Sequence, residues 1–254
     1  MLLENRKGLI FGLANTYSIA WAIAQEAKAQ GAELGFTYLN EAIEKRMRPL
    51  AESLQAPLIL PCDVGSDEQI AAVFEEVGRT WGRLDFLVHA IAFAQKEDLE
   101  GRYVDTSRQG FRVALETSAY SLVSLARAAA PLMTEGGSIL TLSYYGAEKV
   151  VKNYNVMGVA KAALEASVRY LAADLGPQGI RVNAVSAGAI KTLSAKGIRG
   201  FNEMLGVYAD RAPLRRNVET AEVGKASTFL LSPASSGITG EVLYVDSGYH
   251  VLGM

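Results

Sequence analysis

Short apolar runs alternate with longer amphipathic stretches along almost the whole chain. The short runs are typical of strands that are buried on both faces of a sheet. The longer stretches repeat apolar residues at helical spacing, as in Ile70, Val73 and Val77. The pattern predicts strands at residues 8–11, 33–38, 57–61, 84–89, 138–142, 180–185 and 240–245, and helices at residues 19–30, 41–54, 67–80, 108–133, 155–175 and 221–231.

The order of these elements predicts the fold class. Repeated strand–helix–strand crossovers imply a parallel sheet with helices on both of its faces. The sequence contains no domain linker, internal repeat or low-complexity tract, and only residues 188–213 are less regular. We therefore expect one doubly wound (Rossmann-type) α/β domain over residues 1–254, with a mostly seven-stranded parallel sheet.

Composition excludes several classes of function. Half of the 254 residues are apolar and the net charge is −2, so no general affinity for nucleic acid is implied. Cys62 is the only cysteine, which excludes an intramolecular disulfide and a multi-cysteine metal site, and we expect its thiol to be packed. No signal-peptide core and no apolar run of roughly 20 residues is present. We expect a cytoplasmic protein without a metal and without membrane insertion.

The most informative stretch joins the fifth predicted strand to the helix that follows it. Tyr144 comes just after the strand, Tyr154 stands near the start of the helix, and Lys161 lies seven positions beyond Tyr154. Open α/β sheets bind their ligands where the carboxyl ends of strands lead into helices. At about 100° per residue, seven steps return a side chain to nearly the same helix face. Tyr154 and Lys161 are therefore predicted to point into one cleft.

The first strand turns into its helix in the way that dinucleotide-binding folds require. Such a helix N-terminus holds a pyrophosphate through backbone N–H groups and the helix dipole. Gly12 is the only glycine of residues 12–20, so the full G-x-G-x-x-G pattern is absent. Ser18 is expected to cap the helix and could donate its hydroxyl to a phosphate. A capped turn without a ligand remains the alternative.

The next strand ends carry further candidates for a cofactor site. Leu39 follows the second strand and is neither an acid that would hold the adenosine ribose nor an arginine that would suit a 2′-phosphate. Asp63 and Val64 follow the third strand, where they could face adenine; alternatively, Asp63 only caps the next helix. Small residues at 90–94 follow the fourth strand and would let a flat cofactor approach the backbone. His89 is expected to be structural rather than an acid or base.

These segments together resemble the short-chain dehydrogenase/reductase superfamily and, more narrowly, its bacterial NADH-dependent enoyl-acyl-carrier-protein reductases of type II fatty-acid synthesis. The resemblance covers residues 7–246, and its motifs lie at residues 12–20, 62–64, 89–94, 142–146, 153–161, 181–184 and 186–188. It implies NADH/NAD+ as cofactor, an enoyl-acyl carrier protein as thioester substrate, and a homotetramer. It also implies a mobile substrate loop within residues 192–204, inside an insertion at about 190–213.

The resemblance also implies the site residues. It places the acyl substrate near Ala94, Tyr144 and Tyr154. It places the cofactor on Gly12, Ser18, Ile19, Leu39, Asp63, Val64, Ile91, Lys161, Ile190, Lys191, Thr192, Leu193 and Ser194.

The spacing Tyr-x6-Lys is the most specific signal in the sequence. Carbonyl reductases of the superfamily carry Tyr-x3-Lys, but the residue four before Lys161 is Met157, which cannot donate a proton. Tyr154 has the spacing of the enoyl reductase branch. We therefore predict reduction of the trans-2 double bond of enoyl thioesters, with Tyr154 as the O–H donor that stabilises the enolate-like transition state.

The other two members of the predicted catalytic group have supporting roles. Lys161 would hold the nicotinamide ribose and keep the local potential positive. Tyr144 would line the acyl site and could assist protonation. The alternatives are a carbonyl (3-ketoacyl) reductase of the same superfamily, against which Met157 argues, and a non-catalytic dinucleotide-binding regulator, which would have little reason to keep both tyrosines and Lys161.

Overall fold

The computed structural model describes residues 1–192 and 200–253, and within them seven strands form one sheet. All neighbouring strands are parallel, in the order β3-β2-β1-β4-β5-β6-β7. The chain therefore winds outward from β1 in both directions, which confirms the doubly wound fold. The strands are β1 Lys7–Phe11, β2 Glu33–Tyr38, β3 Leu58–Pro61, β4 Phe86–His89, β5 Gly137–Ser143, β6 Ile180–Ala187 and β7 Val242–Val245.

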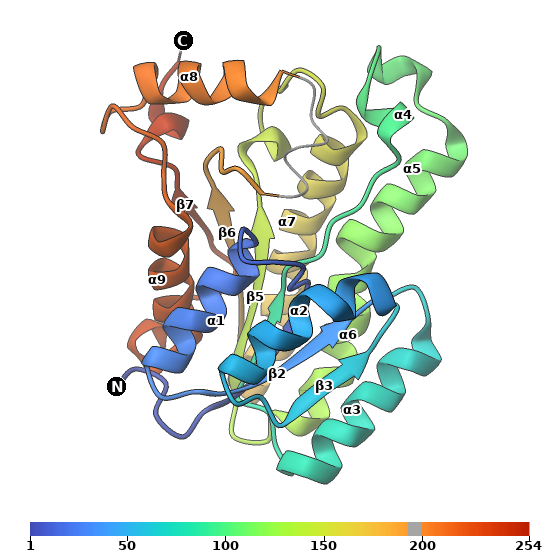
Figure 1. Cartoon of the computed structure of the whole chain (residues 1–254), viewed down its shortest axis with the longest axis vertical. Coiled ribbons are helices and arrows are strands. Elements are labelled where there is room, and N and C mark those ends of the chain that lie inside the picture. Colours follow the sequence, from blue (N-terminus) through green and yellow to red (C-terminus); the bar gives the residue numbers. More distant parts are fainter. Residues whose placement is uncertain (193–199, 254) are drawn as a thin grey trace.

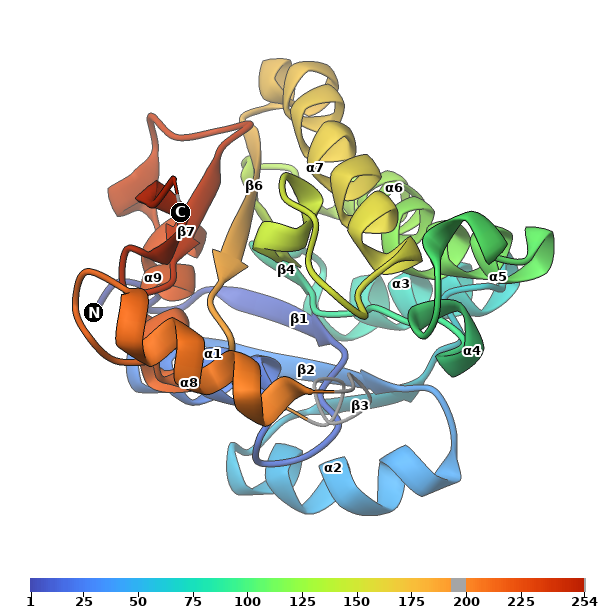
Figure 2. The same cartoon turned by 90° about the horizontal axis from the view of Figure 1, so that it is seen from above.

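Helices cover both faces of the sheet because successive strand residues point to opposite sides. Leu9 and Phe11 of β1 pack in one core cluster with α3, α6 and α7, whereas Ile10 packs in the other with α1, α2 and α9. Figure 2 shows α6 and α7 on one side of the strands and α2 on the other. The helices are α1 Ile19–Ala29, α2 Glu41–Ser53, α3 Asp67–Trp81, α4 Lys96–Leu99, α5 Arg108–Leu115, α6 Ser121–Ala129, α7 Val156–Leu175, α8 Phe201–Arg211 and α9 Thr220–Leu231.

The long helix predicted at residues 108–133 is interrupted. A π-helical turn, Glu116–Tyr120, separates α5 from α6, and a 3₁₀ turn, Ala130–Leu132, ends the region. The Ser118 hydroxyl accepts a hydrogen bond from the Phe93 N–H at 2.9 Å and donates to the Phe93 carbonyl at 3.1 Å. The widened turn thus ties the helix to the segment after β4, a contact that periodicity does not reveal.

The region predicted to be irregular contains a regular helix. Within residues 188–213, helix α8 begins after Gly200, which has φ +80°, and it buries Leu205 and Tyr208. Tyr208 stacks on Tyr249, with ring centroids 3.7 Å apart. Figure 1 shows α8 lying across the end of the molecule toward which β5 and β6 point. It therefore borders the edge of the sheet at which ligands bind in this fold.

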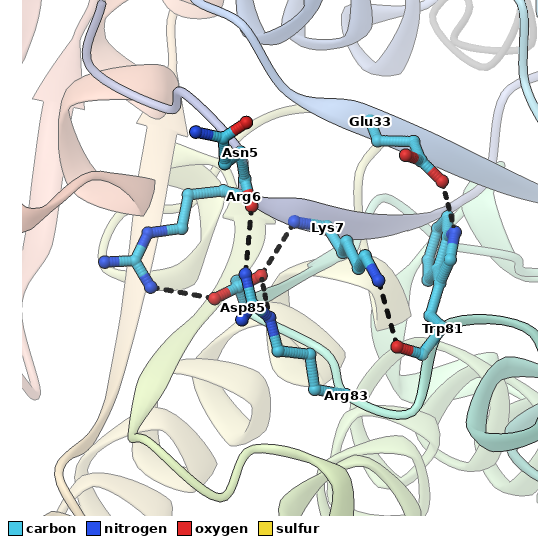
Figure 3. A network of polar contacts seen from close by, with 7 residues as sticks. All are labelled: Asn5, Arg6, Lys7, Glu33, Trp81, Arg83 and Asp85. Carbon is cyan, nitrogen blue, oxygen red and sulfur yellow. Dashed lines mark hydrogen bonds and ion pairs between the residues drawn. The ribbon is translucent and has the colours of Figure 1, made fainter.

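The opposite edge of the sheet is held together by a buried carboxylate. Asp85, which precedes β4, is 7% exposed and accepts hydrogen bonds from Arg6 Nη1 and the Lys7 N–H, each at 2.8 Å. Arg83 Nε donates to it at 3.3 Å, and Lys7 Nζ reaches the Trp81 carbonyl at 2.9 Å (Figure 3). This network connects β1, α3 and β4 where the strands begin.

Candidate active site

Tyr154 is positioned by a tight turn and not by the helix. Helix α7 begins at Val156, and the two residues flanking Tyr154 have positive φ, 62° at Asn153 and 38° at Asn155. Asparagine is among the few residues that adopt a positive φ, but ψ of −117° places Asn155 outside the ordinary left-handed region, so the turn is strained at that residue. Helical spacing over seven residues was predicted to point Tyr154 and Lys161 into one cleft. That reason is wrong, because Tyr154 lies outside the helix. The turn nevertheless aims its side chain into the cavity that Lys161 lines.

That cavity brings the predicted catalytic residues together. It has a volume of about 420 Å³ and lies between the carboxyl ends of β4, β5 and β6 and the start of α8. Tyr144, Tyr154 and Lys161 all line it, and the two tyrosine rings meet edge to face with centroids 5.0 Å apart. The rest of the wall is largely apolar and includes Ala92, Phe93, Ala94, Leu99, Leu142, Met157, Ala187, Ala189, Ile190, Phe201 and Met204. We refer to it as the acyl cavity.

Tyr144 is anchored by helix α8. Its hydroxyl lies 2.9 Å from the Tyr208 hydroxyl and 3.5 Å from Met204 Sδ. Burial raises the pKa of Tyr144 to about 12, although the Tyr208 hydrogen bond acts in the opposite direction. Tyr208 was not predicted as a site residue, because its partner Tyr144 lies 64 positions earlier in the chain.

Lys161 and Tyr154 are both buried at the base of the acyl cavity. Lys161 Nζ donates to the Leu142 carbonyl at 2.7 Å, and burial lowers the pKa of its ammonium to about 8, against the opposing effect of Glu165. Burial, and secondarily the charge of Glu165, raises the pKa of Tyr154 above its usual value. At neutral pH the pair therefore consists of an intact phenol O–H and a lysine that is mainly protonated.

A second cavity runs from the β1–α1 turn to Lys161. Its volume is about 510 Å³, and we refer to it as the dinucleotide cavity. Among the predicted cofactor residues it is lined by Gly12, Ser18, Ile19, Leu39, Asp63, Val64, Ile91, Lys161 and Thr192. Ile190 lines only the acyl cavity, Lys191 lines neither, and Leu193 and Ser194 lie outside the described residues.

The two cavities share a wall. Ile19, Ala92, Phe93, Leu142, Lys161 and Thr192 line both of them. Lys161 thus stands where one end of an elongated ligand in the dinucleotide cavity would meet a ligand in the acyl cavity.

The residues of the second cavity fit a dinucleotide. Gly12 has φ +95°, and a Cβ there would lie 2.1 Å from the Ala90 carbonyl oxygen, so only glycine lets β1 turn against the end of β4. Helix α1 begins beside this turn, and the first N–H groups of a helix are free to bind a phosphate. At the other strands, Leu39 gives an exposed apolar surface and Asp63 a carboxylate at the cavity wall.

Ser18 shapes the turn and does not cap the helix through its side chain. Its Oγ accepts hydrogen bonds from the N–H groups of Ala14 at 3.2 Å and Asn15 at 3.1 Å, and it makes no side-chain bond to the first turn of α1. The predicted side-chain cap is therefore wrong. These two hydrogen bonds, from N–H groups three and four residues earlier in the chain, orient the Ser18 hydroxyl within the loop. Asp63 likewise turns the chain, accepting from the Gly65 N–H at 2.9 Å.

Comparisons with known proteins identify the family. A family model described as enoyl-(acyl carrier protein) reductase matches residues 12–250. An enoyl-[acyl-carrier-protein] reductase [NADH] of Rickettsia typhi is 55% identical over 99% of this chain and 97% of its own length. The chain belongs to the enoyl-(acyl carrier protein) reductase family.

Solved structures of other members of the enoyl reductase family agree in fold. The Bacillus cereus enoyl-acyl carrier protein reductase with NADP+ and indole naphthyridinone has a TM-score of 0.98 and 54% identity, covering 100% of this chain and 99% of that one. The enzyme of Anaplasma phagocytophilum in complex with NAD has a TM-score of 0.97 and 56% identity, covering 100% and 97%. The fold of this enoyl reductase is thus that of family members solved with dinucleotides.

His89 has a packing role in this member of the enoyl reductase family. Its ring is fully buried, with Nδ1 2.8 Å from Thr141 Oγ1 and Nε2 2.8 Å from Ser121 Oγ. Burial, and then the positive charge of Lys161, lowers the pKa of His89 to about 3. The imidazole is neutral and both of its nitrogens are engaged, so it cannot act as an acid or base in the cavity.

The described residues contain neither a cluster of metal-ligating side chains nor a membrane-spanning helix. No group of three or more His, Cys, Asp or Glu side chains in residues 1–192 and 200–253 is placed to hold a metal ion. In the same part of the chain, no helix has the length and apolar character needed to cross a membrane.

One polar pair at this enoyl reductase site, Ser143 and Glu165, was not predicted from the sequence. Ser143 Oγ donates a 2.5 Å hydrogen bond to Glu165 Oε1, and both residues are buried. Ser143 lines the acyl cavity, and Glu165 lies one helical turn beyond Lys161 on α7. A carboxylate four residues after a buried lysine was the available signal, because side chains at this spacing lie side by side on a helix.

Proposed function

We propose that this chain reduces the trans-2 double bond of enoyl thioesters carried by acyl carrier protein, with NADH as the hydride donor. The observation that carries the proposal is the shared wall of the two cavities. Lys161 lines both, and Tyr154 lines the apolar one beside it. An acyl thioester and a dinucleotide would therefore meet next to a buried phenol and a buried ammonium. The family relationship supports the same substrate and cofactor.

Tyr154 is proposed as the hydrogen-bond donor to the thioester oxygen. Bound NADH would supply a hydride to the β-carbon, so negative charge would develop on that oxygen. The resulting enolate would then take up one proton at its α-carbon, which completes reduction of the double bond. The raised pKa of Tyr154 keeps its O–H intact over the physiological pH range, as a donor requires. A donor of this kind stabilises the transition state more than the ground state, because the oxygen gains charge during the reaction.

Lys161 is proposed to orient the cofactor and to add positive potential. Its position in both cavities lets its ammonium reach a ribose hydroxyl while it stays close to the reacting atoms. Its hydrogen bond to the Leu142 carbonyl holds the side chain in place without neutralising the charge. In a buried site, a single positive charge of this kind acts strongly on a developing oxyanion.

Tyr144 is proposed to bind the acyl thioester and not to donate the proton. Its hydroxyl is already paired with Tyr208, and its ring packs against Tyr154. It therefore forms a fixed aromatic wall that orients the neighbouring ring. Ala94 also lines the acyl cavity and is proposed to contact the substrate. The residues proposed to hold the dinucleotide are those that line its cavity, namely Gly12, Ser18, Ile19, Leu39, Asp63, Val64, Ile91, Lys161 and Thr192.

Met157 argues for an enoyl substrate over a carbonyl substrate. It lines the acyl cavity four residues before Lys161, where its thioether accepts a weak hydrogen bond from Ser118 at 3.7 Å. A thioether has no proton to give, so a ketone bound there would lack the donor that carbonyl reduction needs. A 3-ketoacyl thioester is accordingly expected to be a poor substrate.

The remaining expectations are part of the same proposal. We infer that residues 190–213, including α8, act as the substrate-binding insertion of the single domain, because Phe201 and Met204 of α8 line the acyl cavity. Residues 193–199 of the predicted mobile substrate loop lie outside the described residues. We further propose that the protein is cytoplasmic and forms a homotetramer. A monomer mass measured by light scattering would refute the tetramer.

Replacing the donor tests the function directly. Crotonyl-thioester-dependent oxidation of NADH is measured for the wild type, Tyr154→Phe, Lys161→Ala and, as a matched control, Tyr170→Phe, whose ring is exposed on the same helix. Loss of the phenol O–H is expected to lower kcat by about 10² to 10³. Wild-type rates in both Tyr154→Phe and Lys161→Ala would refute the assignment. A faster reaction with a 3-ketoacyl thioester would favour the carbonyl reductase instead.

A further inference from the structure

Glu165 is a buried carboxylate that the proposed reaction does not use. It is 7% exposed and lies on the inner face of α7, one turn beyond Lys161. Its Oε1 accepts the 2.5 Å hydrogen bond from Ser143, whose side chain lines the acyl cavity. Burying a carboxylate is costly unless hydrogen bonds or nearby positive charge compensate for lost water. The groups that surround Glu165 therefore indicate why a carboxylate is buried next to Lys161.

Within residues 1–192 and 200–253, the Lys161 ammonium has no direct ionic partner. It donates a hydrogen bond to the neutral Leu142 carbonyl and forms no ion pair within 4 Å with any of these residues. Side chains four residues apart on a helix have Cβ atoms about 5–6 Å apart, so Glu165 is the neighbouring carboxylate on this face. Its charge is the one that supports the Lys161 ammonium against burial.

The other groups around this pair do not take over that role. Facing Glu165 are Arg169 of the same helix, Glu148 just after the 3₁₀ turn Tyr145–Ala147, and the neutral phenols of Tyr154 and Tyr244. Burial raises the pKa of Glu165, whereas the hydrogen bond from Ser143 and the charge of Lys161 lower it and so favour the carboxylate. Arg169 and Glu148 have opposite charges and opposite effects on that pKa. On its β4 side, Lys161 faces the neutral His89. Among the described residues, Glu165 is the buried carboxylate whose charge acts on the lysine.

We propose that Glu165 is a positioning residue that keeps Lys161 positively charged during the reaction. The inference rests on the proposed function of the same site. Lys161 would then be able to hold the cofactor and stabilise the oxyanion throughout the neutral pH range. The hydrogen bond from Ser143 fixes the carboxylate so that it acts on the lysine from a constant position. The contact is indirect, which leaves all of the ammonium N–H groups except the one on Leu142 available to the ligands.

The test separates charge from shape. Glu165→Gln removes the charge but keeps an oxygen that can accept from Ser143, whereas Glu165→Asp keeps the charge and shortens the side chain. Glu135→Gln is the control, because it changes net charge equally at an exposed position just before β5, at the opposite edge of the sheet. The measurement is kcat/KM for a crotonyl thioester with NADH from pH 6 to 9.

The expected result is a shift of the alkaline limb of the profile in Glu165→Gln by about one unit to lower pH, with little change at pH 6. At pH 8 this corresponds to a loss of about fivefold in kcat/KM, approaching about tenfold at pH 9. Glu165→Asp and Glu135→Gln should keep the alkaline limb of the wild type. An unshifted limb in Glu165→Gln, or a larger shift in Glu165→Asp, would overturn the proposal, because shape and not charge would then be decisive.

A second readout does not depend on turnover. The rate at which acetic anhydride modifies Lys161 is followed against pH by peptide mass spectrometry, since only the neutral amine reacts. The apparent pKa of Lys161 is expected to fall in Glu165→Gln, and an unchanged value would refute the inference. An inactive wild type with a normal lysine shift would refute the proposed function alone.

Discussion

The close packing of the two tyrosines depends on Gly146, which allows a sharp prediction. Gly146 lies in the 3₁₀ turn after Tyr144, with φ outside the left-handed region, so alanine is compatible with its backbone. A Cβ at this position would lie 2.5 Å from Cδ1 and 2.8 Å from Cε1 of Tyr154, and 3.2 Å from Cδ1 of Tyr144. Carbon atoms in ordinary contact are about 3.5–4.0 Å apart. The Tyr154 ring must therefore move by about 1 Å.

A displacement of that size affects catalysis more than folding. Misplacing a reacting group by about 1 Å can cost about 10²-fold in rate, whereas overpacking usually costs about 1–3 kcal/mol of stability. We expect Gly146→Ala to remain folded and to lose about 10²-fold in kcat/KM for a crotonyl thioester. Steady-state kinetics and urea unfolding measure the two quantities on the same preparation.

The control lies at the other end of α7. Gly176 has φ −53° and ψ −43°, and no atom lies within 4 Å of the position of its Cβ. Gly176→Ala is expected to stabilise the fold by about 0.4–1 kcal/mol through the unfolded state and to leave the kinetics unchanged. If Gly146→Ala were folded and its kcat/KM stayed within about threefold of the wild type, the position of the Tyr154 ring would not limit the reaction as argued.

Three further predictions concern stability and reactivity. Asp85→Ala removes the acceptor of the Lys7 N–H and the partner of Arg6, so urea unfolding should show a loss of about 2–3 kcal/mol; a loss below about 0.5 kcal/mol would contradict the role of this network. The hydrogen bond from Arg216 lowers the pKa of Glu222 to about 2, so the ionised carboxylate stabilises the fold fully above the ordinary carboxyl pKa, and this stabilisation is lost as the pH falls through about 2. The difference in unfolding free energy between the wild type and Glu222→Gln should therefore close between about pH 5 and pH 2, and a constant difference would refute this. Burial raises the pKa of the Cys62 thiol to about 11, so a thiol reagent at pH 7 should label it only after denaturation, and rapid labelling of the native protein would be the contrary result.

The sheet could be predicted well from the sequence because its strands are short and mostly apolar, as in β1. Leu9, Ile10 and Phe11 are all fully buried, although they face different helix layers, and only a strand covered on both sides produces such a run. Helix α8 was missed because its pattern is weak, with buried side chains at Leu205 and Tyr208 among many exposed ones.

The site was predicted less evenly than the fold. Gly12, Asp63 and Lys161 could be located because each follows a strand end or a helix start at a recognisable spacing. Tyr154 was located by an argument that assumed a helix, whereas two asparagines with positive φ set its direction. The contacts of Tyr144 with Tyr208 and of Ser143 with Glu165 join distant segments, and hydrophobic patterning carries no information about such pairs.

The wall shared by the two cavities also has a thermodynamic consequence. Because Ile19, Phe93 and Lys161 contact both spaces, a dinucleotide bound in one cavity becomes part of the surface that a ligand in the other one meets. Each ligand then displaces water from the shared side chains and restricts their motion. The second ligand therefore loses less conformational entropy when it binds. The two binding free energies are therefore coupled, and the coupling is equal in both directions. A small apolar molecule in the acyl cavity would thus tighten the binding of a dinucleotide, and the dinucleotide would tighten the binding of that molecule by the same factor.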